Sequence, residues 1–300
     1  MPELPEVQTT VDGINTVAKN RRIVDTWTDF NSLAKMFSGS IKNPAYFLKF
    51  KKAVQGAKIL MAERRAKNIL IHLDNKETIL IHMKMTGHVM YGSYVYDKKK
   101  NSWSPVPGQT ALEDPYNRFV HLVFTLDNGK HLVLADSRKF AKVIVLDDMT
   151  KEEMKLIGPE PLSDDFTYDI FHTNINRFQN KYIKTALLDQ RLVAGIGNIY
   201  SDEILHESHI LPDRTVSSLS PIDLKTIYKN IKPILKRGID FGGDSTSDYR
   251  NIYGERGTFQ GKHKVYRRTG KQCFTKNCDG IIERAVINGR SAHFCKECQK

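Results

Sequence analysis

The sequence predicts an α+β protein with several domains: an N-terminal helix with an antiparallel β-sandwich or flattened barrel, then a helical domain that ends in a metal-binding β-hairpin. Short apolar or alternating runs bounded by turn residues fill the first half of the chain. Beyond about residue 150 the apolar spacing becomes helical, and all four cysteines lie within the last 28 residues. The domains expected from these changes are 1–150 (sandwich), 151–162 (linker), 163–262 (helical domain) and 263–300 (hairpin).

The composition predicts a soluble globular protein with a basic surface. Hydrophobic residues make up 40% and charged residues 27% of the 300 positions. No apolar run approaches the roughly 20 residues that cross a bilayer, and the start lacks the features of a secretory signal. We therefore expect a cytoplasmic protein, associated with the nucleoid if the source is bacterial. The net charge of +12 favours a polyanionic partner, either nucleic acid or an anionic membrane surface.

The first helix is predicted from the opening of the chain. Pro2 and Glu3 suit a first helical turn, and Leu4, Val7 and Val11 begin an apolar series at helical spacing. Considered alone, this stretch is an ordinary amphipathic helix.

The same residues also suit covalent catalysis. Methionine aminopeptidase removes Met1 before a small residue, which would leave Pro2 as a secondary amine. An α-amino group has a pKa of about 7.7–8.0, against about 10.4 for lysine, so much more of it is neutral and nucleophilic at neutral pH. Proline is somewhat more basic than this, which reduces the advantage. Glu3 and Glu6 are candidate acid and base groups beside this amine.

Paired strands are predicted through the rest of the first half. Two pairs flank tight turns, and a fifth run closes the series: 57–73 and 78–91 around Asp74-Asn75-Lys76, 119–126 and 130–135 around Asp127-Asn128-Gly129, and 142–146. Residues 91–117, with lysines at 98–100, are expected to form a long surface loop.

Helices are predicted after the stiff connector Gly158-Pro159-Glu160-Pro161. They cover 181–190 and 198–207, and a third begins at Ser220-Pro221, with Pro233 as a kink. The Gly-, Ser- and Asp-rich stretch 241–261 is expected to be a mobile loop.

The cysteines predict one structural zinc site. The spacing of Cys273, Cys278, Cys295 and Cys298 is C-x4-C-x16-C-x2-C, two chelating pairs joined by a spacer with the turn Asn288-Gly289. Four thiolates complete a tetrahedron and leave no position for water. His293 is an alternative ligand.

Several motifs together resemble one family, the formamidopyrimidine-DNA glycosylases of the Fpg/Nei group. The resemblance spans nearly the whole chain, and its pieces occur in the family's order: Pro2-Glu3-Leu4-Pro5-Glu6-Val7, Arg64-Arg65-Ala66-Lys67, Met85-Thr86-Gly87, Gly158–Leu162, Gly195–Tyr200, Val265–Arg268 and the terminal cysteines. It implies a β-sandwich catalytic domain, a helix–two-turn–helix domain and a zinc finger. It also implies a monomer that binds damaged double-stranded DNA, excises an oxidised base and cleaves the strand by β,δ-elimination.

The resemblance also implies roles for the residues in the matching motifs. Pro2 would be the nucleophile at the sugar C1′, Glu3 the proton donor and shuttle, and Glu6 a second pocket carboxylate. Lys67 would lie near the damaged nucleotide; from the local sequence alone it is a solvated strand end.

Two further groups of residues match DNA-contacting positions of the family. Met85, Arg138 and Phe140 match the triad that fills the gap left by a flipped base, although base rates alone favour core packing for the methionine and phenylalanine. Here Asp136-Ser137-Arg138-Lys139-Phe140-Ala141 replaces the usual Asp-Pro-Arg-Arg-Phe-Gly, which leaves the shape of this loop open. The expected phosphate ligands are Lys184, Asn198, Arg290 and His82.

The substrate class has alternatives. Leu4 favours the branch that excises 8-oxoguanine and formamidopyrimidines, because the endonuclease VIII-like branch commonly has glycine there. The rivals are such a pyrimidine glycosylase and a non-catalytic zinc-ribbon protein that binds nucleic acid through charge alone.

Overall fold

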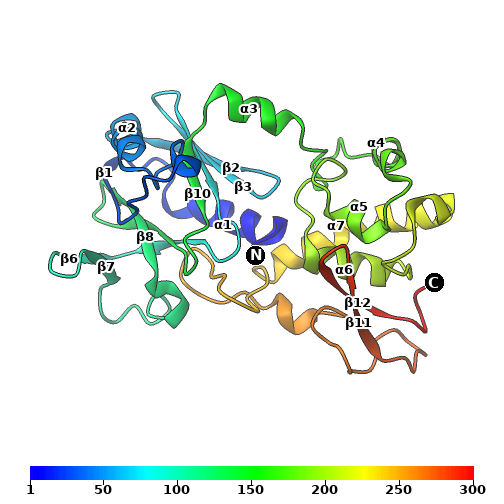
Figure 1. The fold of residues 1–300 in the computed structure, drawn as a ribbon. Coiled ribbons are helices and arrows are strands. Elements are labelled where there is room, and N and C mark those ends of the chain that lie inside the picture. The colour runs from blue at the N-terminus through cyan, green and yellow to red at the C-terminus, as the bar shows by residue number, and fades with distance from the viewer. The chain divides into compact units, whose positions relative to one another are not determined.

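The computed structural model describes all 300 residues and contains two compact units (Figure 1). Unit 1 comprises Met1–Lys151 and Phe241–Thr258, and unit 2 comprises Glu152–Asp240 and Phe259–Lys300. The main division lies close to the expected boundary at residue 150. Residues 241–258, which were expected in the helical domain, instead pack with unit 1.

Unit 1 contains two antiparallel four-stranded sheets, which confirms the predicted sandwich. The strand order is β1-β8-β9-β5 in one sheet and β10-β4-β3-β2 in the other. The strands are β1 (Ile23–Thr28), β2 (Ile59–Arg65), β3 (Asn68–Leu73), β4 (Thr78–His82), β5 (His88–Gly92), β8 (Val120–Leu126), β9 (His131–Ala135) and β10 (Lys142–Val145). The predicted turn at 127–129 joins β8 to β9, with Thr125 paired to His131.

One core fills the space between these sheets and their helices. Alternate residues of both sheets, such as Leu122, Leu134 and Ile69, join apolar residues of α1 (Leu4–Val17) and α2 (Pro44–Val54). Asn15 fixes α1 to β2, since its side chain accepts from the Ala62 N–H and donates to the Ala62 carbonyl. The C-terminal end of α1 is thereby held against the sheet.

The expected surface loop at 91–117 contains regular secondary structure. It forms the hairpin β6 (Tyr94–Asp97) and β7 (Ser102–Pro105) and the 3-10 turn Pro115–Arg118. This segment covers the second face of the β1-β8-β9-β5 sheet, where Met90, Val123 and Val133 pack with Tyr94 and Leu112. Both faces of β9 are therefore buried, which its continuous apolar sequence reflects.

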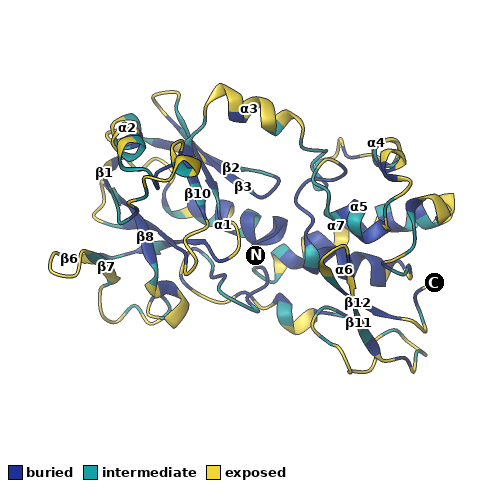
Figure 2. Ribbon diagram, viewed as in Figure 1, coloured by how far each residue is buried: buried dark blue, intermediate teal, exposed yellow.

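Unit 2 is built from helices and a terminal hairpin. Along the chain it is preceded by α3 (Asp148–Lys155), in which unit 1 ends and unit 2 begins, and Figure 2 shows this helix as mostly exposed. The other helices of unit 2 are α4 (Tyr168–Ile175), α5 (Ile183–Leu188), α6 (Asn198–Glu207) and α7 (Pro221–Asp240, with Pro233 inside), and the hairpin strands are β11 (Ile282–Ile287) and β12 (Arg290–Cys295). Shorter 3-10 turns occur at Lys35–Phe37 in unit 1 and at Asn176–Phe178, Val216–Ser218 and Phe259–Lys262 in unit 2. None of these helices has the length and hydropathy needed to cross a membrane.

Candidate active site

The N-terminal turn brings Pro2, Glu3 and Glu6 together in unit 1. Glu3 is the N-cap of α1, and its backbone N–H donates to Glu6 Oε2 at 2.7 Å. Glu3 and Glu6 are 2% and 1% exposed, and Pro2 is buried, whereas the preceding Met1 is 40% exposed. The nitrogen expected to act as nucleophile is thus next to two buried carboxyl groups.

Glu6 also anchors the segment 241–258. Its Oε1 accepts from the Asp244 N–H at 2.7 Å, and its carbonyl oxygen accepts from the Tyr249 hydroxyl at 3.1 Å. Burial, with the nearby Glu3 charge, raises the pKa of Glu6 to about 7. Gly243 has φ +85°, and a Cβ there would lie 2.9 Å from Glu6 Cγ. Only glycine allows this close approach.

Lys67 lies in the turn between β2 and β3, beside the start of α1. Ala66 takes φ +55° in this turn, and Lys67 is 8% exposed, so it is not the solvated strand end that its local sequence suggests. Arg64, at the end of β2, donates from Nε to Gln8 Oε1 of α1 at 2.9 Å. This contact places the β2–β3 turn at the same end of unit 1 as Pro2 and Glu3.

His82 is a neutral imidazole in this structure. Burial, with the Lys84 and Lys67 charges, lowers the pKa of His82 to about 3. Its Nδ1 accepts from the Lys84 N–H at 3.0 Å. A phosphate contact from His82 would therefore be a hydrogen bond from Nε2 rather than an ion pair.

The loops that carry Met85, Arg138 and Phe140 are joined by the buried carboxylate of Asp136. It accepts from the Thr86 hydroxyl and from the Ala141 N–H, the latter at 2.7 Å. Met85 and Phe140 are 38% and 47% exposed, so the core-packing alternative does not hold for either. The Arg138 guanidinium lies 4.5 Å from the centre of the Phe140 ring.

The structure also shows the shape of the loop in which the family's proline and glycine are missing. Lys139 takes the left-handed conformation with φ +57°. The Ser137 hydroxyl donates to Asp248 Oδ2 at 2.6 Å, which connects this loop to the segment 241–258. Asp136 and Ser137 therefore hold the loop without a proline.

In unit 2, Asn198 and Arg290 lie at the ends of elements. Asn198 is the first residue of α6, and its Nδ2 donates to Ser291 Oγ at 3.3 Å, while its Oδ1 is buried without a partner. Arg290 is exposed and begins β12 directly after Asn288-Gly289, whose φ values are +45° and +75°. The predicted two-stranded ribbon and its turn are therefore present, with Arg290 beside the tip.

Lys184 does not lie where it could touch a phosphate directly. Its side chain is 0% exposed and forms an ion pair with Asp202, and its Nζ is 3.3 Å from Ser201 Oγ. A phosphate contact would require this buried pair to separate, which leaves an uncompensated charge. In this structure Lys184 joins α5 to α6.

The four cysteines lie together and fit one tetrahedral metal ion. Cys273 and Cys298 sulfurs are 3.7 Å apart, Cys278 and Cys295 sulfurs are 3.6 Å apart, and all four are within 4.8 Å of one another. Tetrahedral Zn²⁺ with bonds of about 2.3 Å requires sulfurs about 3.8 Å apart. His293 is not part of this cluster, because its Nδ1 lies 3.0 Å from Asp202 Oδ2.

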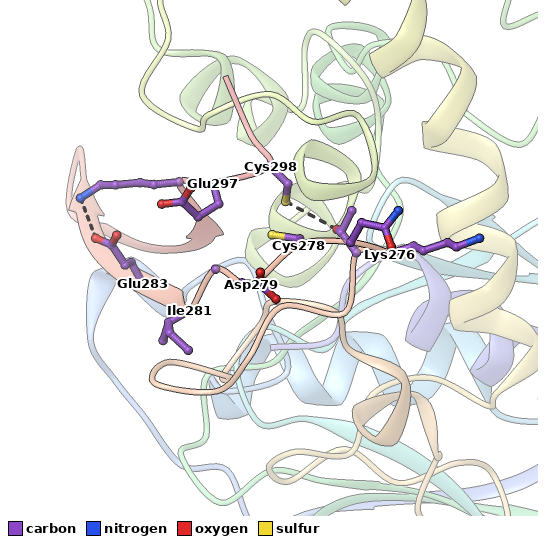
Figure 3. A pocket seen from close by; sticks show the side chains of 11 residues that line it. Lys276, Cys278, Asp279, Ile281, Glu283, Glu297 and Cys298 are labelled. Atoms are coloured by element: carbon purple, nitrogen blue, oxygen red, sulfur yellow. Dashed lines mark hydrogen bonds and ion pairs between the residues drawn. The ribbon is translucent and has the colours of Figure 1, made fainter.

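A groove of about 730 Å³ opens beside two of these cysteines (Figure 3). Cys278 and Cys298 line it and are partly exposed, whereas Cys273 and Cys295 are buried. Lys296 and Glu283 form an ion pair of 2.6 Å at its edge. The cysteine cluster is thus accessible from the side of Cys278 and Cys298.

Comparison with known proteins decides the family. Residues 1–143 match the formamidopyrimidine-DNA glycosylase N-terminal domain, and residues 157–250 match the formamidopyrimidine-DNA glycosylase H2TH domain. The chain is 35% identical to the formamidopyrimidine-DNA glycosylase of Herpetosiphon aurantiacus over 300 residues, covering 100% of both chains. The chain belongs to the formamidopyrimidine-DNA glycosylase family. The Bacillus subtilis member is 34% identical over 303 residues, covering 100% of this chain and 99% of its own.

Solved structures of the formamidopyrimidine-DNA glycosylase family have the same fold. Lactococcus lactis Fpg in complex with DNA containing an abasic site has a TM-score of 0.81 and 27% identity, covering 99% of each chain. Thermus thermophilus MutM (Fpg) has a TM-score of 0.78 and 28% identity, covering 99% of this chain and 98% of its own.

Several residues that support the site in this glycosylase were not found by sequence reasoning. Asp244 and Tyr249 contact Glu6 from more than 230 positions away, and no local pattern marks such contacts. Asp202 was also missed, because nothing in the helix 198–207, where polar and apolar residues are mixed, marks it as a buried side chain.

Proposed function

We propose that this chain is a bifunctional DNA glycosylase and abasic-site lyase that removes oxidised purines in base excision repair. The enzyme class is supported by the similarity of the whole chain to members of the formamidopyrimidine-DNA glycosylase family. The observation that supports the chemistry is the buried N-terminal turn, in which Pro2 adjoins Glu3 and Glu6 while Met1 is exposed to an aminopeptidase.

The reaction begins at the secondary amine that removal of Met1 would create. The Pro2 nitrogen attacks the sugar C1′, the glycosidic bond breaks, and its electron pair leaves with the base, which takes a proton. The amine nitrogen then loses its proton, the C1′–O4′ bond breaks with O4′ taking a proton, and the nitrogen lone pair forms an iminium with C1′. This iminium acidifies the C2′ proton, so that β-elimination expels the 3′ phosphate and δ-elimination expels the 5′ phosphate. We assign to Glu3 the proton transfers in these steps.

Glu6 and Lys67 would act around the extruded nucleotide. Because the pKa of Glu6 is about 7, a large share of its carboxyl is protonated near neutral pH and can donate a hydrogen bond. Lys67 carries a charge at the same end of the unit and would hold the backbone of the damaged nucleotide. Leu4, 0% exposed under the first turn, favours purine lesions as the sequence predicted.

Exposed and cationic groups would hold the duplex. Met85, Arg138 and Phe140 would fill the gap left by the flipped base, which offsets an unstacking cost of a few kcal/mol. Asn198, Arg290 and His82 would contact phosphates, and the net charge of +12 would attract the duplex. The Lactococcus lactis relative, solved with DNA that contains an abasic site, supports DNA as the partner.

We further propose that the four cysteines hold one Zn²⁺ in a structural role. Four sulfurs at tetrahedral spacing complete its coordination. The ion would stabilise the hairpin that carries Arg290. We also propose that the protein acts as a monomer in the cytoplasm.

Borohydride trapping tests the central step. Protein lacking Met1 should give a covalent adduct with 8-oxoguanine DNA at Pro2, located by mass mapping. Pro2→Gly should give no adduct, and protein that retains Met1 should lose it almost completely. Full strand cleavage by protein that retains Met1 would contradict the mechanism.

Paired substrates test the lesion class and the rivals. Cleavage of an 8-oxoguanine:C duplex should exceed that of a thymine glycol:A duplex. The reverse order would favour an endonuclease VIII-like enzyme, and DNA binding without any adduct would favour a non-catalytic zinc-ribbon protein. Neither rival is favoured by the family relatives.

A further inference from the structure

One face of α6 holds the C-terminal part of unit 2 through four polar side chains. Their spacing of i, i+4, i+5 and i+8 places them along one side of the helix. Asn198 contacts Ser291, and the Asp202 carboxylate accepts from the His293 N–H at 3.0 Å. The Glu203 carboxylate accepts hydrogen bonds of 2.8 to 3.0 Å from the backbone N–H groups of residues 264–266. His206 contacts the cysteine cluster. The contacts of Asn198, Asp202 and Glu203 join α6 to other segments of unit 2. His206 differs because its neighbours are sulfur atoms.

The ring of His206 lies directly against two of the thiols. Its Nε2 is 3.4 Å from Cys273 Sγ and 3.9 Å from Cys298 Sγ, and it is 3.3 Å from Thr275 Oγ1. The residue is 3% exposed, and its Nδ1 is buried without a partner. No protein group other than the cysteine cluster and Thr275 is hydrogen-bonded to this ring.

The chemistry of the sulfurs determines the direction of this contact. A thiolate accepts hydrogen bonds and cannot donate them, and a neutral imidazole has one N–H. A proton on Nε2 gives the sulfurs a donor, whereas a proton on Nδ1 would direct the Nε2 lone pair at negative charge. Zn²⁺ with four thiolates has a formal charge of −2, so an N–H donor reduces the charge that the protein must accommodate.

We propose that His206 is a positioning residue for the zinc site, donating from Nε2–H to the Cys273 thiolate and, more weakly, to Cys298. The hydrogen bond stabilises the metal-bound thiolates and couples metal occupancy to α6, whose first residue is Asn198. His206 is not a metal ligand, because the four sulfurs already fill a tetrahedron and the imidazole is not among the mutually close ligand atoms. This inference concerns zinc retention and rests on the proposed zinc site, but it is independent of the glycosylase chemistry.

Zinc transfer to a chromophoric chelator tests the proposal in the full-length protein. A chelator can approach through the groove that Cys278 and Cys298 line (Figure 3), on the partly exposed side of the cluster. His206→Phe keeps a ring without a donor and should release zinc about 10-fold faster, the lower end of typical effects for partners of metal ligands. His206→Gln keeps an N–H near the position of Nε2 and should stay close to the wild-type rate. His172→Phe, on α4 of the same unit, is the matched control and should release zinc at the wild-type rate.

Two spectroscopic measurements distinguish the possible roles. Co²⁺-substituted wild-type protein and His206→Phe should both show the charge-transfer and d–d bands of four-sulfur coordination. A nitrogen-containing spectrum that changes in the variant would make His206 a ligand and overturn the proposal. Equal zinc-transfer rates in the wild type and the Phe variant would overturn it as well.

A measurement on the unaltered protein keeps the proposal testable if the Phe variant does not fold. Nitrogen NMR of the zinc-loaded wild type should show the His206 proton on Nε2, and a proton on Nδ1 alone would contradict the assignment. Because neither zinc transfer nor the tautomer depends on Pro2, failure here leaves the trapping experiment unaffected, and failure of trapping leaves this inference unaffected.

Discussion

At the scale of single residues, Glu6 connects sequence-distant parts of unit 1. One carboxylate accepts the N–H of Glu3 at the start of α1 and the N–H of Asp244 in the segment 241–258. Backbone N–H donors favour the charged form, but burial opposes it more strongly and raises the pKa to about 7. The protonation state of Glu6 therefore affects both folding and the donor available in the pocket.

Glu6→Gln should reduce the pH dependence of stability. The pKa of Glu6 is about 7 in the folded state and about 4.5 unfolded, so between these pH values the unfolded chain loses its proton first. The wild type should lose roughly 3 kcal/mol of unfolding free energy from this group as pH rises from 4.5 to 7.5. Urea unfolding of both proteins at pH 5 and pH 8 measures this, since groups common to both cancel. Parallel stability–pH curves would contradict the assigned pKa.

Lys184 and Arg290 are both cations of unit 2, but they should respond oppositely to substitution. Lys184→Ala leaves Asp202 charged and buried, and should lower the unfolding free energy by about 3–5 kcal/mol. Arg290→Ala should leave stability within about 0.5 kcal/mol and reduce the slope of log affinity against log salt by about 1. Urea unfolding and salt-dependent DNA binding check both. If Lys184→Ala has an unchanged unfolding free energy and a reduced slope of log affinity against log salt, Lys184 is a phosphate ligand after all.

At the scale of elements, the loops around Met85 and Phe140 should matter for function and not for folding. Both side chains are substantially exposed, so Met85→Ala and Phe140→Ala should change stability by about 0.5 kcal/mol or less. Both variants should excise 8-oxoguanine at least about 10-fold more slowly, because the gap left by the flipped base stays open. Leu48→Ala, at a 69% exposed position of α2, is the control for removal of an exposed apolar side chain. Single-turnover excision at saturating enzyme measures the effect, and equal rates in all four proteins would refute the wedge role.

The elements that the sequence predicted well are those with local signals. The turns at 127–129 and 288–289 contain Asn-Gly, and α6 begins after Gly197 and ends at Glu207 as its apolar spacing indicated. The hairpin within 91–117 was missed because its polar composition resembles a loop, and the segment 241–258, which is a loop as expected, was not expected to pack with unit 1. Their order comes from distant contacts, such as the pair of Arg250 with Asp114 at 3.0 Å. Partners separated by 136 positions leave no periodic pattern to find.

In the candidate site too, residues in local motifs could be predicted, whereas residues that depend on distant contacts could not. The residues that we propose carry the reactive atoms could be named from the sequence, because Pro2, Glu3 and the cysteines belong to recognisable motifs. It did not predict how Asp136, Asp202 and Asp244 support them, since each acts through a partner that is distant along the chain. Lys184 was expected to contact a phosphate, but its side chain is buried and forms an ion pair with Asp202.

At the scale of the whole molecule, removal of the metal should affect unit 2 and spare unit 1. The cysteine hairpin does not form a separate unit, because it is joined to α6 by Asp202, Glu203 and His206. Chelation should therefore raise hydrogen exchange in β11, β12 and 264–266, and also in α6, while α1 and the two sheets of unit 1 keep their protection. DNA affinity should fall together with the protection of α6.

Mass spectrometry of zinc-loaded and chelated protein measures the hydrogen exchange of each segment separately. Cys295→Ser serves as a second route to metal loss that involves no chelator. Loosening confined to the hairpin, with α6 unchanged, would show that the helix is held independently of the metal, and loss of protection in unit 1 would show that the two units do not respond separately.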